Sequence, residues 1–140
     1  MNLLARNTPS LMGEVTCPGD KSISQRVLMI GSLLNTDIKI TGFLNGEDPI
    51  STANALNNIG SSISIEDTSV TIKKRVVPFM SSNEIVDLGN SGTGMRLMMG
   101  LVSGLGLDAT LVGDDSLSKR PMLRVANPLN KMGASAVSYT

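Results

Sequence analysis

Residues 18–26 read Pro-Gly-Asp-Lys-Ser-Ile-Ser-Gln-Arg. They follow a segment that is partly apolar, and they open a segment whose apolar residues have helical spacing. The Pro-Gly turn places Lys21 and Ser22 on the first turn of the predicted helix, where unpaired backbone N–H groups favour an anion. Ser22 and Arg26 are four residues apart, so they project from one face of that helix. The segment therefore offers two cations, a hydroxyl and a helix N-terminus to a small phosphorylated or carboxylated ligand.

The same residues also have a purely structural interpretation. Pro-Gly-Asp is an ordinary turn sequence, and a lone Lys or Arg at a helix start is usually solvated. Spacing alone leaves both interpretations open.

Composition narrows the classes of function. Twelve Lys and Arg residues balance twelve Asp and Glu residues, and the chain has two Phe, one Tyr and no Trp. A neutral chain with so few aromatic rings argues against nucleic-acid binding. Histidine is absent, which excludes histidine bases and histidine metal ligands and leaves acid–base work to Lys, Asp or Glu.

Two further features concern location. No apolar run approaches the roughly 20 residues that span a membrane, and the start lacks the long apolar region of a signal peptide. The lone Cys17 cannot form an internal disulfide, and we interpret it as a small buried residue in a strand rather than a catalytic thiol. We therefore expect a soluble, cytoplasmic protein with no membrane partner.

Hydrophobic periodicity predicts the first set of elements. A helix over about 21–34 carries an apolar stripe of Ile23, Val27, Ile30 and Leu34. The elements that follow are a strand at about 37–42, a helix capped by Asp48 and running from Pro49 to about 59, and two short strands at about 62–65 and 69–73.

The same order then recurs. We expect a strand at 85–88, a Met- and Leu-rich helix that residues 90–94 open and that runs to about 103, a strand at 108–112, and a helix from Pro121 to Gly133. Several residues of the first copy have an identical residue in the second, and the distance along the chain between the two grows slowly. It is 70 residues for Arg26 and Arg96, 71 for Asp37 and Asp108 and for Gly42 and Gly113, and 73 for Gly60 and Gly133. This order predicts a duplicated strand–helix–strand–helix–strand–strand unit.

The second copy lacks its last strand, which would begin near residue 142. Natural domains seldom leave a sheet edge unpaired, so we expect this chain to be an N-terminal piece of a longer protein.

Two later helix starts share the character of the first. Gly92, in the run Asn-Ser-Gly-Thr-Gly, lets backbone N–H groups approach a ligand closely. Arg120 precedes Pro121 at a helix-cap position, where a guanidinium cannot accept a hydrogen bond from the helix. Lys21, Gly92 and Arg120 could therefore converge on one anion, although glycines at strand-to-helix junctions are often only geometric.

Three motifs, in order along the chain, resemble the signatures of the 5-enolpyruvylshikimate-3-phosphate synthase family, the 3-phosphoshikimate 1-carboxyvinyltransferases. They are residues 18–26, residues 88–96 (Leu-Gly-Asn-Ser-Gly-Thr-Gly-Met-Arg) and residues 113–122 (Gly-Asp-Asp-Ser-Leu-Ser-Lys-Arg-Pro-Met), and the similarity runs from about residue 8 to the end. The resemblance implies an α/β fold, called α+β by some schemes, with two domains of three βαβαββ units each. This chain would hold about one and two-thirds units. Residues 1–17 would form an opening strand that packs with the second domain, and residues 18–140 would form part of the first, substrate-binding domain.

The resemblance also implies a reaction. The enolpyruvyl group of phosphoenolpyruvate would pass to the 5-hydroxyl of shikimate 3-phosphate through a tetrahedral intermediate, with release of phosphate, in the shikimate pathway to chorismate and the aromatic amino acids. By position, Lys21 would contact both substrates and act as the catalytic residue that aids proton transfer. Ser22 and Arg26 would hold shikimate 3-phosphate, and the Gly92 backbone N–H and Arg120 would bind phosphoenolpyruvate. No metal or organic cofactor is implied, because cations and helix N-termini can bind and orient both anions. The full-length family is usually monomeric.

The chain departs from the family pattern at two positions. Gln25 stands where histidine is usual, and Ser118 stands where a basic residue is common. Gln25 removes a titratable neighbour of the site, and we expect substrate binding to survive this change.

Two other functions compete with this interpretation. The UDP-N-acetylglucosamine enolpyruvyl transferases usually have Lys-Asn where this chain has Lys21 and Ser22, and they use a loop cysteine near Arg120 that this chain lacks. We therefore reject them. The other alternative is a non-catalytic module that binds a phosphosugar-like anion, and for the 140-residue chain alone we expect this behaviour.

Overall fold

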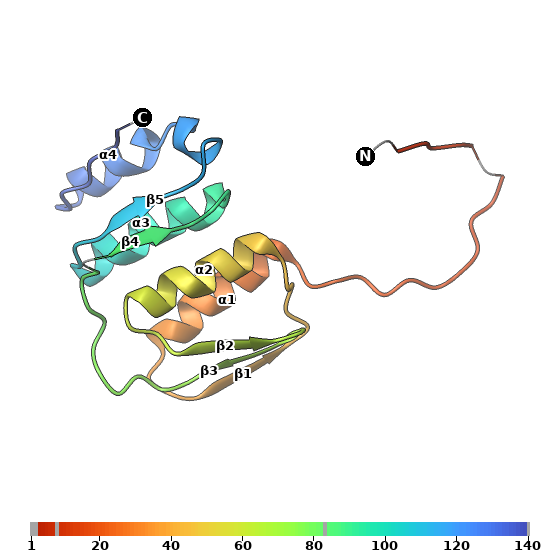
Figure 1. The fold of residues 1–140 in the computed structure, drawn as a ribbon, viewed down its shortest axis with the longest axis horizontal. Helices are drawn as coiled ribbons and strands as arrows, with labels where there is room; N and C mark the ends of the chain where they lie inside the picture. Colours follow the sequence, from red (N-terminus) through yellow and green to blue (C-terminus); the bar gives the residue numbers. More distant parts are fainter. Residues whose placement is uncertain (1–2, 8, 83, 140) are drawn as a thin grey trace.

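The computed structural model describes residues 3–7, 9–82 and 84–139 (Figure 1). The first set of elements is α1 (Lys21–Leu33), β1 (Ile38–Thr41), α2 (Glu47–Asn58), β2 (Ile63–Glu66) and β3 (Ser69–Ile72). The second set is β4 (Ile85–Asp87), α3 (Gly92–Leu105), β5 (Thr110–Val112), the 3-10 turn η1 (Leu117–Lys119) and α4 (Leu123–Lys131). The predicted order is thus confirmed for these elements.

The first set forms an antiparallel sheet under two helices. Its strand order is β1-β3-β2, and Ile72 of β3 pairs with Ile38 on one side and Ile63 on the other. Alternate side chains of a strand face one side of a sheet, so Val70 and Ile72 both point to the buried face. Figure 1 shows α1 and α2 covering that face.

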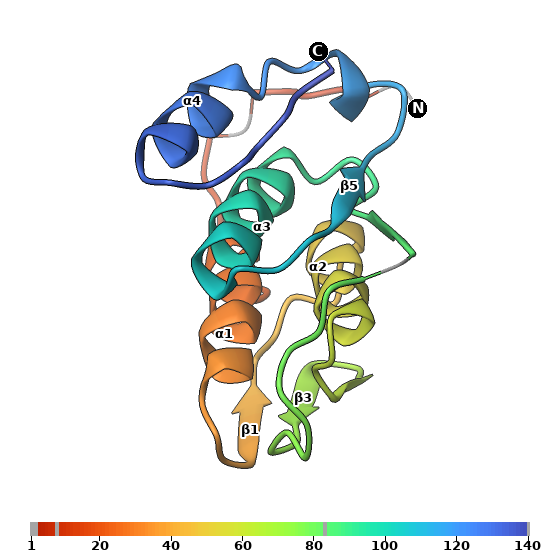
Figure 2. The ribbon, with the colours of Figure 1, turned by 90° about the vertical axis from the view of Figure 1, so that its left-hand side faces the viewer.

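The second set begins with a parallel pair, β4 and β5, in which Val86 pairs with Leu111. Parallel neighbours need a crossover connection, which α3 supplies. Figure 2 shows α3 running alongside α1 and α2, so the two sets of elements pack through their helices.

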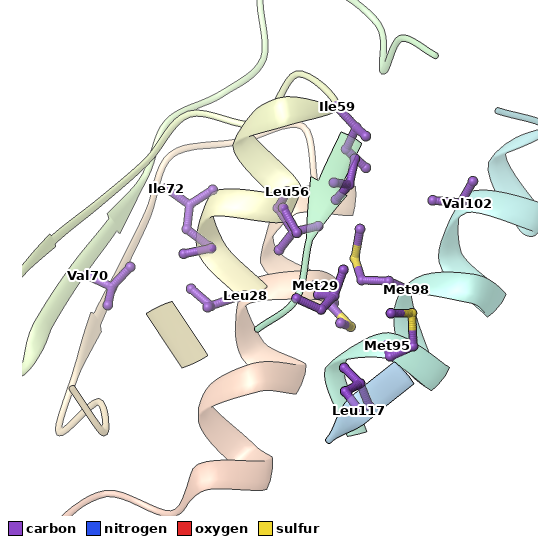
Figure 3. Packing of buried hydrophobic residues seen from close by; sticks show 14 of the residues in the cluster. Leu28, Met29, Leu56, Ile59, Val70, Ile72, Met95, Met98, Val102 and Leu117 are labelled. Atoms are coloured by element: carbon purple, nitrogen blue, oxygen red, sulfur yellow. The ribbon is translucent and has the colours of Figure 1, made fainter. Parts of the chain in front are cut away.

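One hydrophobic core joins both sets. Its members come from the sheet, from α1, α2 and α3, and from η1 (Figure 3): Leu28, Met29, Leu56, Ile59, Val70, Ile72, Met95, Met98, Val102 and Leu117. Gly31 lets α1 lie close to the sheet, because a Cβ at this position would be 2.6 Å from Cδ1 of Ile72. A side chain at position 31 would press on the end of the Ile72 side chain.

The predicted apolar stripe of α1 is not the face that this core buries. Ile23, Ile30 and Leu34 are 68%, 60% and 50% exposed. The buried face carries Leu28 and Met29 together with Ser24, Gln25, Gly31 and Ser32. Small and polar residues lie there because α1 packs closely against α2 and the sheet.

Two predicted helix starts were wrong. Asp48 is not the cap of α2: Gly46 is the N-cap, and Asp48 lies within the first turn, where its charge still suits the helix dipole. The helix predicted from Pro121 begins at Leu123, so Arg120 is not its cap. Arg120 instead ends η1 in an extended conformation, because its N–H donates to the Leu117 carbonyl at 2.9 Å and a following proline disfavours helical backbone.

The opening strand predicted over residues 1–17 is one that packs with a second domain, so it stays a prediction. The described residues 3–7 and 9–17 contain no strand, and they run away from the body of the molecule (Figure 1). Cys17 is exposed and lies outside any strand, which corrects its assignment as a buried strand residue. A strand needs a neighbour to pair with, and the described residues 3–7 and 9–17 belong to neither sheet. In addition, no helix among the described residues has the length and apolar character needed to cross a membrane.

Candidate anion-binding site at the helix starts

The start of α1 is fixed by Gly19 and Asp20. A Cβ on Gly19 would be 2.3 Å from the Gly42 carbonyl oxygen, so only glycine fits where the chain passes the end of β1. The Asp20 carboxylate caps α1 by accepting from the Ile23 N–H at 2.7 Å. These two residues fix the backbone that presents Lys21 and Ser22.

Lys21 points toward the start of α2. Its ammonium donates to Oδ2 of Asp48 at 2.9 Å, and the Lys21 side chain is 52% exposed. An exposed ion pair of this kind contributes about 1 kcal/mol or less to stability. An incoming anion can therefore exchange with Asp48 as the partner of Lys21.

Ser22 and Arg26 lie on one exposed face of α1, as their spacing predicts. Nη1 of Arg26 donates to the Ser22 carbonyl at 3.1 Å. This contact holds the guanidinium close to the first turn of the helix.

The start of α3 is built around Ser91 and Gly92. Ser91 is buried and caps α3, because its Oγ accepts from the Gly94 N–H at 3.1 Å. A Cβ on Gly92 would be 2.7 Å from Nη1 of Arg120 and 3.5 Å from Nη1 of Arg96. Gly92 and Arg120, which the sequence separates by 28 positions, are thus neighbours in space.

The Gly92 N–H is already engaged. It donates to the Asn90 carbonyl at 3.0 Å. A ligand oxygen that binds this N–H must share it with Asn90 or replace that contact.

A hydrogen-bonded chain orients Arg120. Nη2 of Arg120 donates to Oδ1 of Asn90 at 2.7 Å, and Nδ2 of Asn90 donates to Oδ2 of Asp114 at 2.6 Å. The Leu117 N–H donates to the other oxygen of Asp114 at 2.7 Å. These contacts, that of Leu117 first and that of Asn90 second, lower the pKa of Asp114 below its ordinary value.

Arg96 is a second guanidinium beside Gly92. Its Nη1 donates to the Gly92 carbonyl at 3.4 Å, and its Nε is buried with no hydrogen-bond partner among the described residues. Neither Arg96 nor Asn90 was among the predicted site residues. For Arg96 the sequence does hold a signal, because Arg96 matches Arg26, a predicted site residue, between the two copies of the unit.

The starts of three helices lie at one end of the molecule. Figures 1 and 2 agree that α1, α2 and α3 all begin on the side where the N-terminal residues enter. Lys21 joins the starts of α1 and α2, and Gln25 joins α1 to α3 by donating to Ser91 Oγ at 2.6 Å. The described residues contain no group of three or more His, Cys, Asp or Glu that could hold a metal ion. The arrangement suits small anions.

A sequence model of the family EPSP synthase (3-phosphoshikimate 1-carboxyvinyltransferase) matches residues 6–139. This chain belongs to that family. It is similar to the 3-phosphoshikimate 1-carboxyvinyltransferase of Thermoanaerobacter sp. (strain X514), with 44% identity over 96% of this chain and 32% of the relative. The enzyme of that name from Ruthia magnifica subsp. Calyptogena magnifica is 48% identical over 94% of this chain and 30% of the relative.

Solved structures agree with the sequence comparison. The structure of EPSP synthase from Acinetobacter baumannii superposes with a TM-score of 0.81 at 42% identity, covering 88% of this chain and 28% of that one. The α/β fold class and the EPSP synthase architecture predicted from the motifs are therefore confirmed. The chain spans about a third of the length of its EPSP synthase relatives, with 32% of the first relative covered.

Proposed function

We propose that this chain supplies part of the active site of an EPSP synthase. The protein that we consider is one of the relatives' length that begins with residues 1–140, which we call the family-length protein. It would transfer the enolpyruvyl group of phosphoenolpyruvate to the 5-hydroxyl of shikimate 3-phosphate and release phosphate. The placement of Gly92 beside Arg120, whose guanidinium donates to Asn90 at 2.7 Å, carries this proposal, because it brings two of the three motifs together at the start of α3.

Shikimate 3-phosphate would bind at the start of α1. Lys21, Ser22 and Arg26 lie on the first two turns, and the helix N-terminus adds its own attraction for an anion. The substrate phosphate would replace Asp48 as the partner of the Lys21 ammonium. Arg26 would turn from the Ser22 carbonyl toward the ligand.

Phosphoenolpyruvate would bind at the start of α3. Arg120 would pair with one of its anionic groups while Asn90 and Asp114 hold the guanidinium in place. The Gly92 N–H would donate to a ligand oxygen that it shares with the Asn90 carbonyl. Lys21 would reach both substrates and stabilise the charge that develops during the addition, as well as moving a proton.

We further infer that the family-length protein works in the cytoplasm as a monomer and without a metal or organic cofactor. The family likeness and the cations at the helix starts, which can bind and orient both anions, support this inference. Ser118, at the position where a basic residue is common, is exposed at η1, and Arg120 and Lys119 carry the charge there.

A kinetic comparison tests the proposal. The family-length protein is mixed with both substrates, and phosphate release is measured for the wild type, for Lys21→Ala and for Lys39→Ala. We expect Lys21→Ala to lower kcat by about a hundredfold or more, because it removes a charge and a proton-transfer group from the reacting centre. Lys39, an exposed residue of β1, is the control and should leave kcat unchanged.

Two outcomes would contradict the proposal. Absence of phosphate release by the wild type would reject the activity. A near-normal rate for Lys21→Ala would show that Lys21 only shapes the turn.

The alternative, a non-catalytic anion-binding module, applies to the 140-residue chain alone. It rests on the observation that this chain covers about a third of its relatives. Calorimetry of the chain with shikimate 3-phosphate, then with phosphoenolpyruvate, separates the two cases. We expect no turnover, as for a non-catalytic module, and weak or absent binding, because this chain holds only part of the proposed site. Tight binding without turnover would favour the module, and turnover by this chain would show that it needs no further segment.

A further inference from the structure

Gln25 is a fully buried polar residue at the point where three helix starts meet. Its exposed fraction is 0%, and its Nε2 donates to Ser91 Oγ at 2.6 Å and to Thr52 Oγ1 at 3.0 Å. Ser91 caps α3 and Thr52 lies in α2. One carboxamide of α1 thus touches both neighbouring helices.

The direction of these bonds is determined by the surrounding groups. Thr52 donates its hydroxyl proton to the Asp48 carbonyl at 2.9 Å, so its oxygen accepts from Gln25. The same nitrogen lies 3.4 Å from the Asp48 carbonyl oxygen, which can only accept. The NH₂ group of Gln25 therefore faces α2 and α3.

The other end of the carboxamide is unsatisfied. Oε1 of Gln25 is buried and has no hydrogen-bond partner among the described residues. A buried polar atom without a partner destabilises the folded state, and an apolar side chain of similar shape would avoid this cost. Folding alone therefore gives no reason for glutamine at this position.

Gln25 lies between the two proposed substrate subsites. On its own helix it lies directly before Arg26 and three positions after Ser22. At the start of α3 its partner is Ser91, the residue that precedes Gly92. Gly94 faces the same group, since a Cβ there would be 2.6 Å from Ser91 Oγ and 3.1 Å from Nε2 of Gln25. A side chain at position 94 would therefore press on both ends of the hydrogen bond between Gln25 and Ser91.

We propose that Gln25 is a positioning residue that sets the start of α3, and with it Gly92 and Arg120, at a fixed distance from Lys21, Ser22 and Arg26. This inference rests on the proposed function, because it assigns the two helix starts to two substrates that must meet. A displacement of about 1 Å between reacting groups can cost about a hundredfold in rate. A hydrogen bond between the helices that carry the two subsites is a direct way to limit such a displacement.

The test uses the family-length protein and Gln25→Leu, which keeps the approximate shape and removes both polar ends. We expect the melting temperature to change by less than about 4 °C, because an unsatisfied buried oxygen is removed together with the hydrogen bonds. We expect kcat/KM for phosphoenolpyruvate to fall about tenfold or more. The binary dissociation constant of shikimate 3-phosphate should change little, since Gln25→Leu leaves the start of α1 intact.

Ser32→Ala is the matched control. Ser32 is also a buried polar residue of α1, its Oγ has no partner among the described residues, and it makes no bridge to α3. It should leave the phosphoenolpyruvate kinetics unchanged. Amide exchange of residues 88–96 should become faster in Gln25→Leu and stay unchanged in Ser32→Ala.

A double-mutant cycle identifies the bridge itself. If Gln25 acts through Ser91, then Gln25→Leu combined with Ser91→Ala should lower kcat/KM by much less than the product of the two single effects. Multiplicative effects, or wild-type phosphoenolpyruvate kinetics and exchange in Gln25→Leu, would overturn the inference. Absence of enolpyruvyl transfer in the wild type would instead reject the proposed function, so the two failures are distinguishable.

Discussion

At the residue scale, two glycines of α3 that lie two positions apart are required for different reasons. Gly92 leaves space for the Arg120 guanidinium, and Gly94 leaves space for the hydroxyl of Ser91. Neither has a left-handed backbone conformation, so the requirement is one of space and not of φ. The motif from residue 90 to residue 94 therefore combines a ligand-facing glycine with a packing glycine.

Substitution of Gly94 should separate this packing role from helix propensity. Ala normally stabilises a helix interior by about 0.5–1 kcal/mol relative to Gly. We expect Gly94→Ala to lower the free energy of unfolding by about 1–2 kcal/mol instead, because its Cβ displaces Ser91 from the cap. Urea denaturation of the chain measures the change.

Gly100 provides the control in the same helix. A Cβ at Gly100 would meet nothing within 4 Å, so Gly100→Ala should raise the free energy of unfolding by about 0.5–1 kcal/mol. Equal effects of the two substitutions would contradict the cap argument.

At the element scale, the sequence predicted most elements because their signals are local. Alternating apolar residues mark β1, β2 and β3, and helical spacing marks α1 and α3, with Gly106 as the stop of α3. The start of α4 was missed because it depends on Asp114, which holds η1 through the Leu117 N–H. This contact joins residues only three positions apart, but the apolar spacing around Pro121 does not show it.

The buried face of α1 shows the limit of periodicity. The helix has apolar residues on two faces, and the regular stripe of Ile23, Val27, Ile30 and Leu34 is the more conspicuous one. The core instead uses Leu28 and Met29 among small residues, since close packing against α2 and β3 needs little side-chain volume. An apolar pattern shows which residues can be buried but does not choose between two apolar faces.

The candidate site was predictable in its residue types but not in its connections. Glycine and cations at successive helix starts predict an anion site, and the structure places Gly92 beside Arg120. Asn90 and Asp114 were not assigned, because the hydrogen bonds that link them to Arg120 and to each other span 30 and 24 positions. Gln25 was interpreted only as the loss of a titratable group, and its contact with Ser91 spans 66 positions that local spacing cannot relate.

At the scale of the whole molecule, the two sets of elements share one core. Met29 of α1 belongs to the same buried cluster as Met95 and Met98 of α3 (Figure 3). The relative placement of the two proposed subsites therefore depends on helix packing as well as on the bridge from Gln25 to Ser91.

A substitution in α3 should accordingly weaken both sets of elements. Met98 is 0% exposed, so Met98→Ala should lower the free energy of unfolding by about 2–5 kcal/mol. Met132, which is 83% exposed, is the matched control, and Met132→Ala should change it by no more than about 0.5 kcal/mol. Hydrogen exchange should show β3 and β4 losing protection together in Met98→Ala, because a shared core unfolds cooperatively. Loss of protection in residues 85–131 alone would show that the two sets of elements fold independently, and the geometry between the subsites would then depend on contacts outside this core.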